Sequence, residues 1–274
     1  MAKILKWIPS GISSFDAIIG GGFPSGSLIL LSGEEGSGNV EFTYTSTVTL
    51  AAMKKSRTAP PSARGGVLPE QICYISFSRS KSDIIDEITR SFTSEFHELF
   101  EKDVNFKDLS PEYFANLRVP SEWTHKMGTT KKTKKGEIRT SLVNILNKNA
   151  KNSVVILHSL NDLARLYGDD QKWLISFLLG LRRMAKIWNG LIYAIFTPGA
   201  LDSKIETEIK SCFDGILKFG WMKVGTVKRQ RSMYFEKFGG LLPHIEERLG
   251  SFTIEITNRA GLVISQVAML QRLR

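Results

Sequence analysis

A short apolar run, followed by a glycine-rich turn and then a helix, restricts this chain to few folds. The run is Ser27–Ser32, the turn is Gly33–Gly38 and the expected helix is Asn39–Lys55. An apolar run of this length between turn signals is typical of a buried strand. In this order, the N–H groups of the turn and the helix N-terminus converge on one point, where proteins hold phosphate groups. The glycine spacing therefore indicates a phosphate loop, although close packing alone also explains glycines in such a turn.

The turn lacks the two side chains with which a working phosphate loop ends. Such a loop continues with Lys, which reaches the β and γ phosphates, and then with Ser or Thr, which holds magnesium. This chain has Asn39 and Val40 there. The whole remnant loop is Gly33, Glu34, Glu35, Gly36, Ser37, Gly38, Asn39 and Val40. Its two glutamates oppose a triphosphate, so we expect no cofactor, although the backbone amides leave weak ATP or ADP binding open.

Further apolar runs alternate with helical patterns along the chain. The expected strands are 71–77, 153–158 and 191–196, and the expected helices are 81–92 with Ser82 as N-cap, 137–149 and 170–189. This alternation predicts an α/β fold with a mostly parallel central sheet and helices on both faces. Alternating residues in Met222–Phe238 and Phe252–Ser265 predict antiparallel strands at the C-terminal end.

One domain is expected over residues 1–274, which is an ordinary length for a single α/β core. Residues 93–136 show the weakest pattern in the chain. They end in a run dominated by lysine and threonine, from which we predict a mobile basic loop at about 126–136.

The motifs around the turn resemble those of the KaiC-like ATPases, a branch of the RecA superfamily. Gly11–Asp16 and Gly20–Leu28 look like the segment that precedes the phosphate loop in that family. Downstream, the similar segments are Tyr74–Phe77 for the second strand, Val154–Leu160 for the Walker B strand, and Tyr234–Gly240 with Phe252–Ile256 for the C-terminal strands. The resemblance implies a RecA-like P-loop fold over most of the chain, residues 93–136 excepted.

Compared with that family, the chain has lost four parts of the ATPase machinery. The P-loop Lys and Thr positions hold Asn39 and Val40, and the Walker B aspartate position holds His158. A pair of glutamates after the second strand is replaced by Ser78 and Arg79, and the Lys-x-Arg pair near the C-terminus keeps Lys237 but has Gly239. Because these parts together perform phosphoryl transfer, the resemblance implies an inactive, degenerate member with no catalytic residues.

Several polar residues near these positions have ordinary structural interpretations. His158 has no Cys or His partner at ligand spacing, so a structural histidine is favoured over a metal ligand. Ser159, Asp162 and Arg165 are candidates for a small polar site beside it, while Asp162 also suits a cap after the strand. We interpret Glu41, in the first helical turn, as facing the helix dipole and filling part of the anion niche.

The net charge of +10 suggests contact with a polyanion. Basic residues cluster at 54–64, at Lys126–Arg139 and at Lys223–Lys237, the last expected to be a hairpin with a charged tip. No zinc-finger, helix-turn-helix or aromatic-basic motif accompanies them. No apolar run is long enough to cross a membrane, and Cys73 and Cys212 are expected to be buried free thiols, which indicates a cytoplasmic protein.

Three functions are consistent with these features. The leading hypothesis is a non-catalytic RecA/KaiC-like protein that assembles with copies of itself or with an active KaiC-like relative, in a regulatory or signalling role; an archaeal source would fit the resemblance. The second is a RecA-like paralogue that binds nucleic acid through the basic loops. The third is a nucleotide-binding protein or weak ATPase in which Lys54, Lys204 or Lys237 replaces the missing lysine.

Overall fold

The computed structural model describes residues 6–58, 66–117, 119–120, 122–123, 135–167, 170–224, 228–239 and 250–268. Most of the predicted basic loop at 126–136 lies outside these residues, and so does the tip of the predicted hairpin at 225–227. The last two residues of that predicted loop, 135 and 136, begin helix α7 rather than ending a loop.

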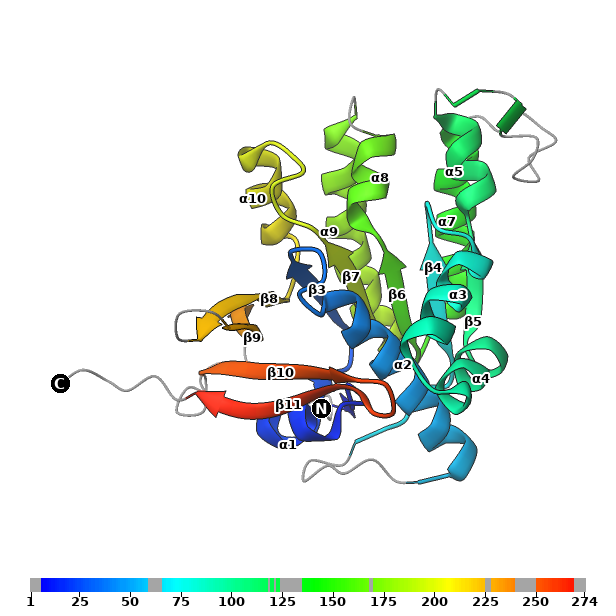
Figure 1. Cartoon of the computed structure of the whole chain (residues 1–274). Coiled ribbons are helices and arrows are strands. Elements are labelled where there is room, and N and C mark those ends of the chain that lie inside the picture. The colour runs from blue at the N-terminus through cyan, green and yellow to red at the C-terminus, as the bar shows by residue number, and fades with distance from the viewer. Residues whose placement is uncertain are drawn as a thin grey trace, which may run out of the picture.

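A nine-stranded sheet forms the centre of the molecule, with the strand order β11-β10-β9-β8-β3-β7-β6-β4-β5 (Figure 1). The six strands from β8 to β5 are parallel, and β9, β10 and β11 continue the sheet in antiparallel fashion. The strands are β3 (Ser27–Gly33), β4 (Ile72–Ser76), β5 (Asn105–Asp108), β6 (Val154–His158), β7 (Leu191–Phe196), β8 (Gly215–Val224), β9 (Lys228–Phe238), β10 (Ser251–Thr257) and β11 (Gly261–Ala268). A separate small sheet pairs β1 (Trp7–Ile8) with β2 (Phe23–Pro24).

Helices cover both faces of this sheet and make two hydrophobic cores. One core includes residues of α1 (Ser13–Ile19), α2 (Asn39–Ser56), α3 (Lys81–Ser91) and α4 (Ser94–Asp103). The other includes residues of α5 (Ser110–Asn116), α7 (Lys135–Asn149), α8 (Leu160–Leu166), α9 (Gln171–Trp188) and α10 (Ser203–Ser211). The predicted fold class, with antiparallel strands at the C-terminal end, is confirmed.

The continuous apolar runs of the central strands follow from this double covering. Successive side chains of a strand point to opposite faces. In β3, Ile29 and Leu31 belong to the core with α2, while Leu28 and Leu30 belong to the core with α9. A polar residue at any of these four positions would therefore be buried, and all four positions hold apolar residues.

The structure corrects the sequence-based boundaries in two places. Ser80, rather than Ser82, is the N-cap of α3, because its hydroxyl accepts from the Asp83 N–H and the Asp83 carboxylate accepts from the Ser80 N–H. The weakly patterned part of 93–136 contains α4, β5 and α5. Strand β5 has only four residues and lies at the edge of the sheet, so it shows no apolar run.

Two further features of the structure are the state of the cysteines and the composition of the helices. Cys73 and Cys212 are both buried and free. Among the helices within the described ranges, none combines the length and the apolar composition that crossing a bilayer requires.

The entry into α1 depends on one buried carboxylate. Asp16 is fully buried, and its two oxygens accept hydrogen bonds from the N–H groups of Ser10 (2.8 Å) and Gly11 (3.2 Å). Burial raises the pKa of Asp16 from 3.8 to about 6, although these hydrogen bonds oppose the rise. The carboxylate thus fixes the chain where it turns into α1.

We predict that Asp16→Asn changes how folding stability depends on pH. Between about pH 4 and pH 6 the folded wild-type chain holds a proton that the unfolded chain has lost, so Asp16 lowers stability as pH rises, in total by an amount on the order of 3 kcal/mol. The variant lacks this decline. Urea unfolding from pH 4 to 7 measures it, with Asp86→Asn on the exposed surface of α3 as the matched control. Parallel profiles for wild type and D16N would contradict the prediction.

Candidate functional site

A cleft of about 560 Å³ lies at the ends of the central strands and contains most of the positions that the sequence singled out. Its walls come from the turn after β3, the residues after β4, the end of β6 with the start of α8, and the residues after β7. Ligands of parallel α/β sheets bind beyond the carboxyl ends of the strands. The lining residues are Glu35, Gly36, Asn39, Val40, Glu41, Ser78, Arg79, Glu87, His158, Ser159, Asn161, Asp162, Arg165, Ile195, Thr197 and Ala200.

The remnant loop is closed by its own hydrogen bonds. The N–H and the hydroxyl of Ser37 both donate to the carbonyl of Glu34, at 3.1 Å and 2.5 Å. Asn39 is buried, and its side-chain oxygen accepts from the N–H of Val40 at 3.1 Å. The amide oxygen of Asn39 therefore occupies a donor in the first turn of α2 that an anion would otherwise use.

Two glycines of the loop are required by close packing. A Cβ at Gly33 would lie 2.6 Å from the Ser37 hydroxyl and 2.9 Å from the Cβ of Phe219. Gly38 has a φ of 113°, and a Cβ there would lie 2.9 Å from Ile254. Both glycines are thus needed for the turn to approach β8 and β10, whether or not a phosphate binds.

The residues after β4 form a small ion-pair cluster. Arg79 makes a salt bridge with Glu87 of α3, and its guanidinium also approaches the carbonyl of Asp83 at 3.5 Å. The carbonyl of Arg79 accepts from the hydroxyl of Ser76 at 2.6 Å. The cation at this position is therefore held against α3 by a carboxylate.

His158 ends β6 as a buried side chain with one hydrogen-bond partner. Its Nδ1 lies 2.8 Å from the hydroxyl of Tyr74 in the neighbouring strand β4. Burial, helped by the charge of Arg79, lowers the pKa of His158 from 6.5 to about 4, although the charge of Asp162 opposes the shift. The imidazole is therefore neutral at pH 7. The peptide bond between His158 and Ser159 is cis.

The polar residues after His158 form one connected network. Both Ser78 and Ser159 donate to Oδ2 of Asp162, at 2.7 Å and 2.9 Å, and Arg165 approaches Oδ1 at 3.4 Å. The N–H of Asp162 donates to the hydroxyl of Ser159, which is the N-cap of α8. The structure thus brings Ser78, Ser159, Asp162 and Arg165 together, with Asp162 as the shared acceptor.

Three contributors to this region have no signal in the sequence. Asn161 bridges to the backbone of Thr197 through two hydrogen bonds of 2.8 Å, and so ties α8 to the segment after β7. Tyr74 and Glu87 pair with His158 and Arg79. Asn161 and Thr197, and likewise Tyr74 and His158, lie far apart along the chain and meet because β4, β6 and β7 are neighbours, whereas Glu87 reaches Arg79 from the helix that follows it.

Glu41 adds a carboxylate to the cleft wall. Burial raises the pKa of Glu41 above its usual value, while its own backbone N–H and the charge of Arg231 oppose the rise. Its Oε2 atom is buried and accepts no hydrogen bond from a described residue. Whether this carboxylate fills part of the anion niche stays a prediction.

The lysines considered as substitutes for the missing P-loop lysine lie elsewhere. Lys54 donates to the carbonyl of Glu70 near the far end of α2, and Lys204 is exposed in the first turn of α10. Lys237 donates to the carbonyls of Lys210 (3.4 Å) and Ser211 (3.3 Å) at the end of α10, and burial lowers its pKa. Gly239 donates its N–H to the carbonyl of Asp214.

The cleft has more carboxylates than cations among its lining side chains. Its cations are Arg79 and Arg165, and no lysine lines it within the described part of the chain. Four carboxylates face these two guanidiniums: Glu35, Glu41, Glu87 and Asp162. In the parts of the chain that the structure describes, no three His, Cys, Asp or Glu side chains gather as metal ligands would.

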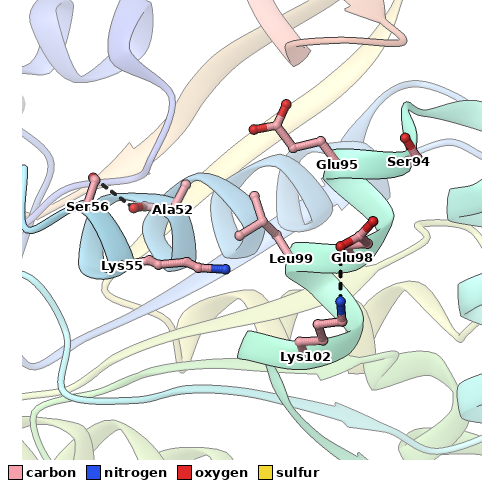
Figure 2. Close-up of a pocket in the computed structure, with 8 residues that line it drawn as sticks. All are labelled: Ala52, Lys55, Ser56, Ser94, Glu95, Glu98, Leu99 and Lys102. Carbon is pink, nitrogen blue, oxygen red and sulfur yellow. Dashed lines mark hydrogen bonds and ion pairs between the residues drawn. The ribbon is translucent and has the colours of Figure 1, made fainter.

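A second depression lies at the other end of α2, between α2 and α4 (Figure 2). It measures about 490 Å³ and is lined by exposed side chains of both signs, including Lys55, Glu95 and the ion pair between Lys102 and Glu98 (3.0 Å). Apart from Lys55, which belongs to the basic cluster at 54–64, no position that the sequence singled out lies here. We therefore take the cleft beside the remnant loop as the candidate site.

Comparison with solved structures identifies the fold. A KaiC-like protein from the hyperthermophilic archaeon Pyrococcus horikoshii has a TM-score of 0.63 at 18% identity, over 96% of this chain and 100% of its own. The flagellar accessory protein FlaH from Methanocaldococcus jannaschii has a TM-score of 0.58 at 15% identity, over 92% and 95%. Neither a protein-family model nor a curated protein sequence matches the chain. The RecA-like fold expected from the motifs is confirmed.

We predict that His158→Asn removes a rise of folding stability with pH. Between about pH 4 and pH 6.5 the unfolded chain binds a proton that folded His158 does not, so its contribution to stability rises with pH, by an amount on the order of 3 kcal/mol. Asparagine keeps an acceptor for Tyr74 but does not titrate. Urea unfolding across this range measures the loss, with His97→Asn on α4 as control. An H158N profile that still rises as in wild type would show the prediction to be wrong.

Proposed function

We propose that this chain is a non-catalytic RecA-like protein, a pseudo-ATPase, that acts by assembling with other protein chains in a regulatory or signalling role. The observation that carries the proposal is the charge of the cleft beside the remnant loop. Four carboxylates and two arginines line it, and one of those arginines is already paired with Glu87. A site that binds a triphosphate needs the opposite balance.

Repulsion between these carboxylates and a triphosphate is large enough to decide whether the nucleotide binds. Two like charges about 6 Å apart repel by about 3 kcal/mol at an effective dielectric constant of about 20, and about 1.4 kcal/mol corresponds to a tenfold change in affinity. Glu35 and Glu41 flank the loop that would hold the phosphates. Even with Glu41 protonated, the Glu35 carboxylate remains in the loop, and Asn39 at the lysine position supplies no positive charge.

At this site, the positions that the resemblance assigns to phosphoryl transfer hold residues with other partners. Asn39 accepts a hydrogen bond from the N–H of Val40, Arg79 pairs with Glu87, and His158 bonds Tyr74. These three side chains are therefore engaged with protein groups at positions where the resemblance implies groups that act on phosphate, magnesium and water. These contacts favour a scaffold over an enzyme.

A RecA-like scaffold without catalysis can still provide a surface for assembly with other protein chains. RecA-like domains associate side by side, so that an edge of one subunit covers the nucleotide site of the next. A copy of this chain or an active KaiC-like relative is the partner that the fold suits. One structure of this fold is named as an accessory protein of the flagellum, which is consistent with a supporting role.

Calorimetry with ATP and magnesium tests the loss of nucleotide binding. The wild-type chain is expected to give no heat of binding at low or moderate salt. The reference is Asn39→Lys/Val40→Thr/Glu35→Gln/Glu41→Gln, which restores the lysine and the hydroxyl and removes two carboxylates, and which is expected to bind. Micromolar binding by the wild-type chain overturns the proposal, and a turnover assay then separates a sensor from an enzyme.

Light scattering coupled to gel filtration tests assembly. A homo-oligomer elutes with a mass that is a multiple of the 30.7 kDa chain. A mass of one chain at every concentration, together with no association with a purified active KaiC-like protein, would contradict the assembly role even if nucleotide binding is absent.

A further inference from the structure

The ribbon formed by β8 and β9 carries a basic and aromatic surface outside the candidate site. In this antiparallel pair Trp221 lies opposite Arg231, and Lys223 lies opposite Arg229. Residues directly opposite share a face, and so do residues two apart in one strand. Trp221, Lys223, Arg229 and Arg231 therefore project from one face of the ribbon, which we call the Trp221 face.

Both arginines of this face lie over the indole ring. The guanidinium carbon of Arg231 is 4.6 Å from the centroid of Trp221, and that of Arg229 is 5.0 Å away. Such contacts hold planar groups in parallel or tilted stacks. The sequence alone shows no aromatic-basic motif, because Trp221 and the arginines belong to different strands.

The cations of the Trp221 face are not neutralised. Lys223 and Arg229 are exposed and Arg231 is half-buried, and none of the three makes an ion pair with a described carboxylate. On the opposite face of the same ribbon, Lys218 pairs with Glu236. The Trp221 face thus differs from the other face of the ribbon, where at least this one lysine has an acidic partner.

The position of Lys223 opposite Arg229 is unfavourable for the ribbon by itself. Like charges directly across an antiparallel pair repel. A polyanion that runs across the face would relieve this repulsion, and it would displace counterions from itself at the same time. The net charge of +10 adds a long-range attraction for the same ligand.

We propose that the Trp221 face binds single-stranded nucleic acid. Lys223 and Arg229 contact backbone phosphates, and an unpaired base stacks on the planar group formed by Trp221 and its arginines. A single strand fits better than a duplex, because bases within a duplex are already stacked on one another. This function is independent of the pseudo-ATPase proposal, since it uses none of the side chains that line the cleft.

The remnant loop sets one limit of this surface. Arg231 donates to the carbonyl of Gly36 at 2.7 Å, so its position is fixed by the loop. The exposed Glu34 and Glu35 precede that glycine and repel a polyanion. The strand is therefore expected to pass over Lys223 and Arg229, away from the turn, and Glu34→Gln/Glu35→Gln is expected to tighten binding.

The test is fluorescence anisotropy of labelled single-stranded DNA and RNA oligonucleotides with the full chain. Lys223→Glu/Arg229→Glu is expected to weaken binding more than about tenfold, and to reduce the slope of log K against log salt by about 1.4, which is about 0.7 for each of two lost phosphate contacts. The variant keeps two like charges opposite each other, so the repulsion within the ribbon stays similar. The matched control is Lys172→Glu/Arg183→Glu on α9, with the same change in net charge.

Substitution of Trp221 gives a second measurement, which a change in net charge alone does not affect. Trp221→Phe is expected to keep most of the affinity but to lose the quenching of tryptophan fluorescence by the oligonucleotide, while Trp221→Ala is expected to weaken binding about fivefold or more. Circular dichroism confirms that each variant is folded.

Three results overturn the proposal. The first is that no oligonucleotide binds at low salt. The second is that the two double variants bind equally, which leaves only net charge as the cause. The third is that charge reversal at Lys223 and Arg229 abolishes self-association while no oligonucleotide binds, which assigns the Trp221 face to a protein interface.

Discussion

The close packing of the glycine-rich turn against the C-terminal strands determines where the rest of the site can lie. Gly33 and Gly38 leave no room for a side chain between the turn and strands β8 and β10, and Arg231 of β9 donates to the carbonyl of Gly36. Strand β3, which delivers the turn, is held between β7 and β8 in the middle of the sheet. Tertiary packing and these hydrogen bonds therefore account for the shape of the loop, so the glycines do not need a phosphate ligand to explain them.

The same packing separates two surfaces of opposite character. The cleft is lined by four carboxylates and two arginines, and the Trp221 face, beyond the loop, has three cations that make no ion pair with a described carboxylate. Arg231 connects the cleft and the Trp221 face, because its guanidinium stacks on Trp221 and its charge also acts on Glu41. A chain with a net charge of +10 thus places carboxylates at the place where its fold would hold phosphate, and places cations on a ribbon beside it. This distribution is the physical basis of both proposals.

Strong local patterns made part of the fold predictable. The run 191–196 was expected as a strand and is β7, and the helix expected at 170–189 is α9 with Asp170 and Asn189 as its caps. Buried strands and long amphipathic helices are set by apolar periodicity over a few residues. Strand β5 and helix α5 escaped prediction because each is short and lies at the edge of the sheet. The sequence indicates Ser82 as the cap of α3 where the structure has Ser80, because both hydroxyls suit the role and only the backbone geometry distinguishes them.

By itself the sequence determined the order of buried strands and helices, the glycine spacing of the turn, and the presence of Asn39, Val40, Arg79 and His158 at positions where the resemblance implies catalytic groups. These features depend on local composition and on motif order, which are read along the chain. Only the tertiary structure decided the partners: Tyr74 for His158, Glu87 for Arg79, Thr197 for Asn161, and the two arginines for Trp221. Each pair except Arg79 and Glu87 joins different strands or the segments that follow them, and even that pair depends on where α3 packs. Such contacts depend on strand order and register, and these are set by the burial of whole faces rather than by any short segment.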